Sequence, residues 1–209
     1  MADEATYNLP VYREVETGKL RTDPCAHVKP VRQPRRQPRT LRPAEVGRLL
    51  SVAPDLRARA IIWLMVGCGC RCGEVAALDV SDWDPIARTL LLRGKGGHER
   101  IVPVPTDAAR AIDAYLDATG VVGGPLIRSH RLPRAGLAPH TIGRMVRGWM
   151  WEAGIKTAPL DGRSAHALRR TCASDVMDRV GDIRVVQELL GHQFAETTAR
   201  HYLRPVSLD

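Results

Sequence analysis

The residues with the clearest chemical potential lie in the last fifth of the chain, over residues 164–202. His166 and Arg169 are three positions apart, so on a helix their side chains would lie on one face. His192 follows a glycine at the end of an apolar run, and Tyr202 comes ten residues later. Imidazole, guanidinium and phenol groups make a poor metal site together. They are well suited to binding and transferring a phosphate group.

Two earlier segments hold cations that such a site could use. Arg71 comes just after Gly67 and Gly69, which interrupt an apolar stretch, and Glu74 follows it. Lys95 lies in the glycine-rich segment GKGGHE. A charge placed beside a buried helix needs a partner or a ligand. Arg71 is therefore either one half of a salt bridge at a helix terminus or part of the phosphate site.

The apolar periodicity predicts the elements that must position these residues. Two strands, Thr89–Arg93 and Arg100–Val104, are expected to form a hairpin with Lys95 at its tip. A Gly/Pro-rich loop is expected over 120–138. Helices are expected over AEVGRLLSVA after Pro43, over LRARAIIWLMVGCG after a capping Asp55, over GEVAAL, over AARAIDAYLDAT up to Gly120, and over 139–153, 164–180, 182–190 and 195–203. The predicted fold class is α+β, mostly α-helical, with a small antiparallel β-sheet.

Composition bounds the partners and the cell compartment. The 209 residues carry a net charge of +8, which indicates a polyanionic partner, nucleic acid first and an anionic membrane second. No apolar run is long enough to span a membrane, and the polar N-terminus lacks a signal-peptide pattern. Five cysteines, mostly in apolar context, favour a cytoplasmic protein with free thiols. Cys68, Cys70 and Cys72 lack zinc-ligand spacing, so small buried hydrophobic residues are the preferred interpretation, and no metal is expected.

A basic, proline-rich segment occupies residues 19–40. Proline and arginine together predict an extended linker, either a solvated tail or a strap along a phosphate backbone. Other arginines lie on the polar side of the predicted 139–153 helix and next to Arg169. The expected DNA-binding residues are Arg32, Arg35, Arg36, Arg39, Arg144, Arg147 and Arg170.

Four segments, in this order, resemble the tyrosine recombinase family of phage integrases and Xer-type recombinases. They are GCGCRCGEVAALDVSDWD, LRGKGGHERIVPVP, AHALRRTCAS and VVQELLGHQFAETTARHYL. Each is weak evidence alone, but together they cover roughly residues 40–203 and are specific. The resemblance implies a site-specific DNA recombinase that cleaves and rejoins strands through a covalent 3′-phosphotyrosine. It also implies double-stranded DNA as the partner, self-association on DNA as a dimer or tetramer, and no cofactor.

The resemblance also implies a role for each candidate catalytic residue. Tyr202 would be the nucleophile, and Lys95 would be the general acid for the departing 5′ oxygen. Arg71 and Arg169 would each bind non-bridging phosphate oxygens through the guanidinium fork. His192 would donate one more hydrogen bond to the phosphate. The transition state is strongly anionic, so a set of fixed cations suits it.

His166 and Glu74 are expected to have supporting roles, and several site residues have simpler interpretations when taken singly. Tyrosine ionisation at pH 7 costs roughly 4 kcal/mol, and His166 is placed to take or return the phenolic proton. Glu74 is expected to orient the site. Taken singly, Lys95 could be an exposed turn lysine, His166 a core histidine, His192 a residue interacting with a helix dipole, and Tyr202 an ordinary helix aromatic.

The chain is expected to have three parts. Residues 1–18 would be the tail of a missing N-terminal core-binding domain, 19–40 the basic linker, and 41–209 the catalytic domain. Only LRPVSLD follows Tyr202, whereas family members often use a longer C-terminal segment to dock on a neighbour, which argues against cooperative tetramer assembly. Arg170 stands where the family often has histidine. Two alternatives are a topoisomerase-like nicking-closing enzyme and a truncated catalytic-domain remnant that binds DNA without completing recombination.

Overall fold

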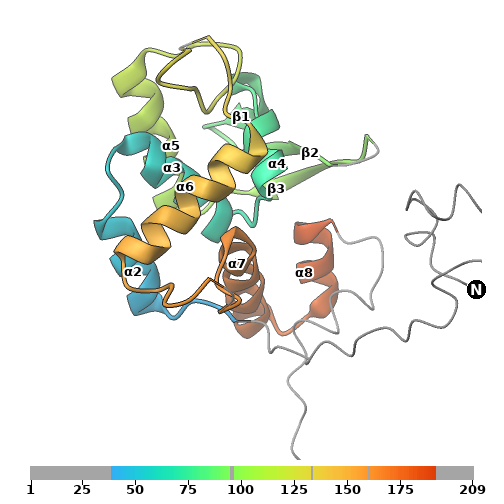
Figure 1. Ribbon diagram of the computed structural model, residues 1–209. Coiled ribbons are helices and arrows are strands. Elements are labelled where there is room, and N and C mark those ends of the chain that lie inside the picture. Colours follow the sequence, from blue (N-terminus) through green and yellow to red (C-terminus); the bar gives the residue numbers. More distant parts are fainter. Residues whose placement is uncertain (1–38, 95–96, 133, 160, 192–209) are drawn as a thin grey trace, which may run out of the picture. The chain divides into compact units, whose positions relative to one another are not determined.

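The computed structural model describes residues 39–94, 97–132, 134–159 and 161–191. All of these belong to the second of two compact units, Gln37–Asp209. The described helices pack together with one small sheet at their side, from which a β-hairpin projects outward (Figure 1), and this confirms the predicted fold class. The helices are α2 (Pro43–Ser51), α3 (Leu56–Val66), α4 (Cys72–Ala77), the 3-10 helix η2 (Val80–Asp82), α5 (Thr106–Thr119), α6 (Pro139–Glu152), α7 (Ala165–Val180) and α8 (Ile183–Leu190).

The sheet has the order β1-β2-β3, and both strand pairs are antiparallel. Strand β2 (Thr89–Arg93) has its predicted bounds, while β3 (Glu99–Pro103) begins and ends one residue earlier than predicted, because Glu99 pairs with Arg93. Strand β1 (Trp83–Asp84) was not predicted. It is two residues long and exists only by pairing with β2, so it leaves no periodic signal. The hairpin of β2 and β3 is thus confirmed, and its predicted tip residue, Lys95, lies outside the described residues.

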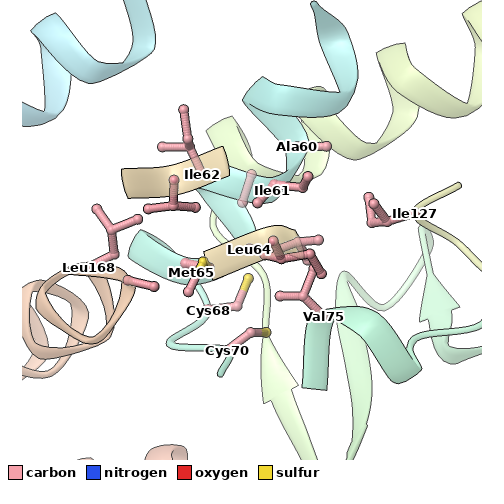
Figure 2. Packing of buried hydrophobic residues seen from close by; sticks show 14 of the residues in the cluster. Ala60, Ile61, Ile62, Leu64, Met65, Cys68, Cys70, Val75, Ile127 and Leu168 are labelled. Atoms are coloured by element: carbon pink, nitrogen blue, oxygen red, sulfur yellow. The ribbon is translucent and has the colours of Figure 1, made fainter. Parts of the chain in front are cut away.

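The core is built around α3, whose buried residues face several neighbours. This helix packs against α5 and α7, and α4 packs against α6. Cys68 and Cys70, just beyond α3, lie among Met65, Leu64 and Val75 (Figure 2). Burial raises the pKa of both thiols. The two cysteines therefore pack as small apolar residues, as interpreted from the sequence.

Local capping signals set the helix ends. The Asp55 carboxylate accepts a hydrogen bond of 2.7 Å from the backbone N–H of Ala58 and begins α3, as predicted. Gly120, Gly181 and Gly191 end α5, α7 and α8 with positive φ angles that favour glycine. The other predicted helices occur with bounds within a few residues of those expected, and the 195–203 helix lies outside the described residues. No helix in the described ranges is long and apolar enough to cross a membrane.

A buried ion pair organises the loop that leads into α7. Lys156 Nζ lies 2.7 Å from Asp161 Oδ1, and both side chains are buried. Lys156 also donates to the backbone oxygens of Pro159 and Arg163. Burial alone would raise the pKa of Asp161, but hydrogen bonds from Lys156 and from backbone N–H groups lower it. The charged pair is thus satisfied by groups of the loop itself, just before α7.

Candidate active site

The carboxylate of Glu74 binds three arginines that come from three separate elements. Arg71, the N-cap of α4, donates its backbone N–H to Oε2 and its Nη1 to Oε1, both at 2.8 Å. Arg100 on β3 contributes a fork, with Nη1 2.9 Å from Oε1 and Nη2 3.0 Å from Oε2. Arg169 on α7 places Nη1 3.4 Å from Oε2. We call these four residues the Glu74 network. It joins α4, the hairpin and α7 around one buried carboxylate.

The end of α8 is attached to this network through its backbone carbonyls. Arg100 Nε donates to the oxygen of Leu189 at 2.9 Å, and Arg169 Nη2 donates to the oxygen of Leu190. The last carbonyls of a helix have no partner inside the helix and carry its partial negative charge. Two guanidinium groups therefore bind the last two residues of α8, Leu189 and Leu190, which precede Gly191 and His192 in the sequence.

The arginines of the network differ in their access to solvent. The Arg169 side chain is 6% exposed, and its Nη1 also donates to the Gly69 oxygen at 2.6 Å. The Arg71 side chain is 39% exposed. Within the described residues, Nε and Nη2 of Arg71 donate to no protein acceptor. Arg71 is thus the member of the network with donors facing outward.

His166 lies on the first turn of α7 and is exposed. Partial desolvation lowers its pKa, and the positive charges of Arg170, Arg169 and Arg71 lower it further. The imidazole is therefore neutral at pH 7 and can accept a proton. The hydrogen bond from Arg169 to Glu74 joins the N-terminal parts of α7 and α4 at this site.

The arginines lower the pKa of Glu74 by more than burial raises it. Burial by itself would raise it, but hydrogen bonds from Arg100 and the Arg71 N–H, with the charges of Arg100 and Arg169, lower it from 4.5 to about 2. Glu74 is therefore ionised throughout the physiological range.

This lowered pKa predicts how stability changes in acid. A carboxylate with a depressed folded-state pKa stabilises the fold above its unfolded pKa and loses that contribution as the pH falls. We expect the free energy of unfolding to drop between about pH 5 and pH 2, with roughly 3 kcal/mol of the loss due to Glu74. Urea unfolding across this range measures it. Glu74→Gln should make the profile less steep, while the comparable contribution of Asp161 and the contribution of Glu45 remain, and an unchanged profile would contradict the assignment.

The structure places some of the predicted site residues and leaves others undescribed. It brings together Arg71, Glu74, His166 and Arg169, as expected from the four matching segments. Arg39, Arg144 and Arg147 are exposed, whereas Arg170 is partly buried and donates to the Gly162 oxygen at 3.3 Å. The predicted residues outside the described part are Lys95, His192, Tyr202, Arg32, Arg35 and Arg36.

Sequence reasoning overlooked Arg100, to which it gave no role beyond the first position of a strand. The strand pattern held a usable signal. Val102 is buried and Ile101 is exposed, so Arg100 shares the inward face with Val102. An arginine on an inward strand face requires a buried anionic partner. The strand face thus indicates a partner for Arg100, and the fold identifies that partner as Glu74.

A family model described as the phage integrase family matches residues 39–207. This range covers most of the chain and the whole Glu74 network. The chain belongs to the phage integrase family. The resemblance drawn from the four segments is thereby confirmed.

Individual relatives are consistent with this family assignment. Tyrosine recombinase XerD of Mycobacterium tuberculosis is 38% identical over 195 residues, covering 87% of this chain and 61% of the relative. XerC of Shewanella amazonensis is 35% identical over 191 residues, covering 88% and 62%. The crystal structure of XerA recombinase matches with a TM-score of 0.72 at 32% identity, over 82% of this chain and 63% of that one.

A lambda integrase dimer bound to a COC′ core site shares the fold, with a TM-score of 0.71 at 20% identity over 94% of this chain and 57% of that one. This chain spans about three fifths of the length of the curated XerD and XerC relatives. In the part that the structure describes, no group of three or more His, Cys, Asp or Glu side chains could hold a metal ion.

Proposed function

We propose that this chain is the catalytic part of a site-specific DNA recombinase that breaks and rejoins strands through Tyr202. The observation that carries the proposal is the Glu74 network beside His166. It fixes the two arginines of the family pattern on one carboxylate, and His166 lies on the same helix as Arg169, three positions before it. Fixed cations with a nearby proton acceptor suit an anionic phosphoryl-transfer transition state.

The proposed cleavage step transfers the scissile phosphate from the 5′ oxygen to Tyr202. The phenolic oxygen of Tyr202 attacks the scissile phosphorus, a Tyr202–phosphate bond forms, and the bond to the 5′ oxygen breaks. His166 takes the phenolic proton, and Lys95 gives a proton to the departing oxygen. The covalent intermediate conserves the bond energy, so rejoining is the reverse attack by a 5′ hydroxyl.

The two arginines would act differently on the phosphate. Nε and Nη2 of Arg71 are available to bind non-bridging oxygens, because only its Nη1 is engaged by Glu74. Arg169 is buried and donates to Gly69 and Leu190, so it would supply positive charge from behind while it fixes the end of α8. His192 would donate a further hydrogen bond to the phosphate.

Double-stranded DNA is the proposed partner, supported by the net charge of +8 and by the exposed Arg39, Arg144 and Arg147. We also propose self-association on DNA, a cytoplasmic location, and a division into residues 1–18, a basic linker 19–40 and a catalytic domain 41–209.

Covalent capture tests the function and selects the target site in the same experiment. The chain is incubated with duplexes that carry a randomised core and a nick that traps the intermediate, and SDS-stable adducts are recovered and sequenced. We expect a selected sequence joined to Tyr202 through its 3′ phosphate, formed equally well in EDTA. Tyr202→Phe should abolish the adduct while it binds the selected duplex as well as the parent chain does.

The other results of this capture are equally informative. An adduct that persists in Tyr202→Phe would overturn the assignment of the nucleophile. Binding with no adduct would favour the DNA-binding remnant. Relaxation of supercoiled DNA with no joining of two selected sites would favour a nicking-closing enzyme.

A further inference from the structure

Arg100 is the residue that connects the hairpin to the rest of the site. It lies on β3, opposite Leu92 and five positions after Lys95. Its fork binds both oxygens of Glu74, and its Nε binds the Leu189 oxygen. The side chain is 13% exposed, and each of its three guanidinium nitrogens has an acceptor. Arg100 thus uses one N–H of each guanidinium nitrogen on Glu74 or on α8, and its described hydrogen bonds are all within the protein.

The contact of Arg100 with Leu189 helps to hold α8 in place. The buried residues of α8, Val186 and Leu190, form a small cluster with Ala173 that is separate from the main core. Val176 and Met177 pack against this cluster, and Leu189 packs against the main core, so apolar contacts and polar contacts together hold α8 in place. Arg100 and Arg169 supply those contacts at the end of α8 that precedes His192.

The packing at Gly191 shows how closely the guanidinium and the helix end meet. A Cβ atom added at Gly191 would lie 3.1 Å from Arg100 Cδ and 3.2 Å from Arg100 Nη1. Gly181 also has a positive φ at a helix end, but a Cβ there would meet nothing within 4 Å. A side chain at 191 would therefore displace Arg100 by a few tenths of an ångström, in addition to straining the positive φ angle.

We infer that Arg100 is a positioning residue that couples the Lys95 hairpin to Glu74 and to the end of α8 that leads into His192. The role rests on the proposed function, because it concerns where two proposed catalytic groups are held. Arg100 would act through Glu74 and α8 and would not touch the DNA. The hairpin, the N-terminus of α4 and the end of α8 would then move together and not separately.

Arg100→Lys tests this role, because lysine keeps the charge and loses the fork. Arg93→Lys is a matched control on the other strand of the hairpin. Arg93 binds the buried carboxylate of Asp82 at 2.6 Å, but it makes no contact with α8 among the described hydrogen bonds and ion pairs. Both variants keep the charge and lose guanidinium hydrogen bonds to a buried carboxylate, so a general loss of stability should appear in both.

Two measurements are made on the full chain. Amide hydrogen exchange over 183–191 should be about tenfold or more faster in Arg100→Lys and near the parent rate in Arg93→Lys. Single-turnover cleavage of the captured duplex at saturating concentration should slow by about tenfold or more in Arg100→Lys, with DNA affinity changed less than about threefold. Gly191→Ala should slow cleavage in the same way, and Gly181→Ala should not.

The outcomes separate this inference from the proposed function. Unchanged exchange in α8, or equal exchange in the two arginine variants, would overturn the role of Arg100 whether or not the parent chain cleaves DNA. A slower cleavage explained wholly by weaker DNA binding would overturn it as well. If the parent chain forms no adduct, the proposed function fails, and the exchange measurement still decides whether Arg100 holds α8.

Discussion

Glu74→Ala is expected to lower the free energy of unfolding by about 3–5 kcal/mol, the usual cost of removing one partner from a buried ionic network. The carboxylate is 4% exposed and accepts hydrogen bonds from Arg71, Arg100 and Arg169. Its removal leaves two largely buried guanidinium groups, those of Arg100 and Arg169, without their anionic partner. Urea unfolding at pH 7 measures the loss, and strand cleavage should fall with it.

Glu99→Ala is the matched control for this change. Glu99 immediately precedes Arg100 on β3, is 54% exposed and pairs with Arg93 at 3.1 Å. Exposed pairs contribute little, so this variant should stay within about 0.5 kcal/mol of the parent chain. Glu74→Gln keeps the side-chain volume and one acceptor, and should lie between the two. Equal stability of Glu74→Ala and Glu99→Ala would show that the network contributes no more than a surface ion pair.

The elements that the sequence predicted correctly are those whose signals are local. Asp55 caps α3 and Gly120 ends α5, as expected, because a capping carboxylate and a left-handed glycine act within a few residues. Strand β2 was also placed correctly, since its bounds are marked by turn residues. Strand β1 depends on pairing with a strand further along the chain, and two residues are too few to show alternation.

The site shows the same division between local and long-range information. Glu74 lies three positions after Arg71, so their pairing across the first turn of α4 follows from helical spacing. Arg100 is 26 positions from Glu74, and Arg169 is 95 positions from it. Only the tertiary fold brings these side chains from β3 and α7 to one carboxylate on α4. The resemblance to the family indicated that Arg169 belongs with Arg71, but it gave no role to Arg100.

Arg71→Ala and Arg169→Ala are expected to separate activity from stability. Arg71 is partly exposed and has donors that face outward, so its removal should slow single-turnover cleavage by about 10²–10³-fold, the usual cost of losing one fixed donor to a transition-state oxygen. The same change should cost only about 1 kcal/mol of stability, because Glu74 keeps Arg100, Arg169 and the Arg71 backbone N–H.

Arg169→Ala should show the opposite balance. Its side chain is 6% exposed and donates to the oxygens of Gly69 and Leu190 as well as to Glu74. Removal takes the Arg169 donors away from the buried Gly69 and Leu190 oxygens and opens a cavity, so the free energy of unfolding should fall by about 3–4 kcal/mol. Cleavage should fall too, and osmolyte that restores folding should recover part of it for Arg169→Ala and none for Arg71→Ala.

Arg144→Ala supplies the control for simple loss of a DNA contact. Arg144 is exposed on α6, and its removal should leave stability unchanged and weaken binding, with cleavage restored at saturating protein in low salt. Cleavage by Arg71→Ala should not be restored in this way, and Arg71→Lys should stay impaired because an ammonium group cannot form the fork. If saturating protein restores Arg71→Ala to the parent rate, Arg71 acts in DNA binding alone and the phosphate in the transition state is held by other groups.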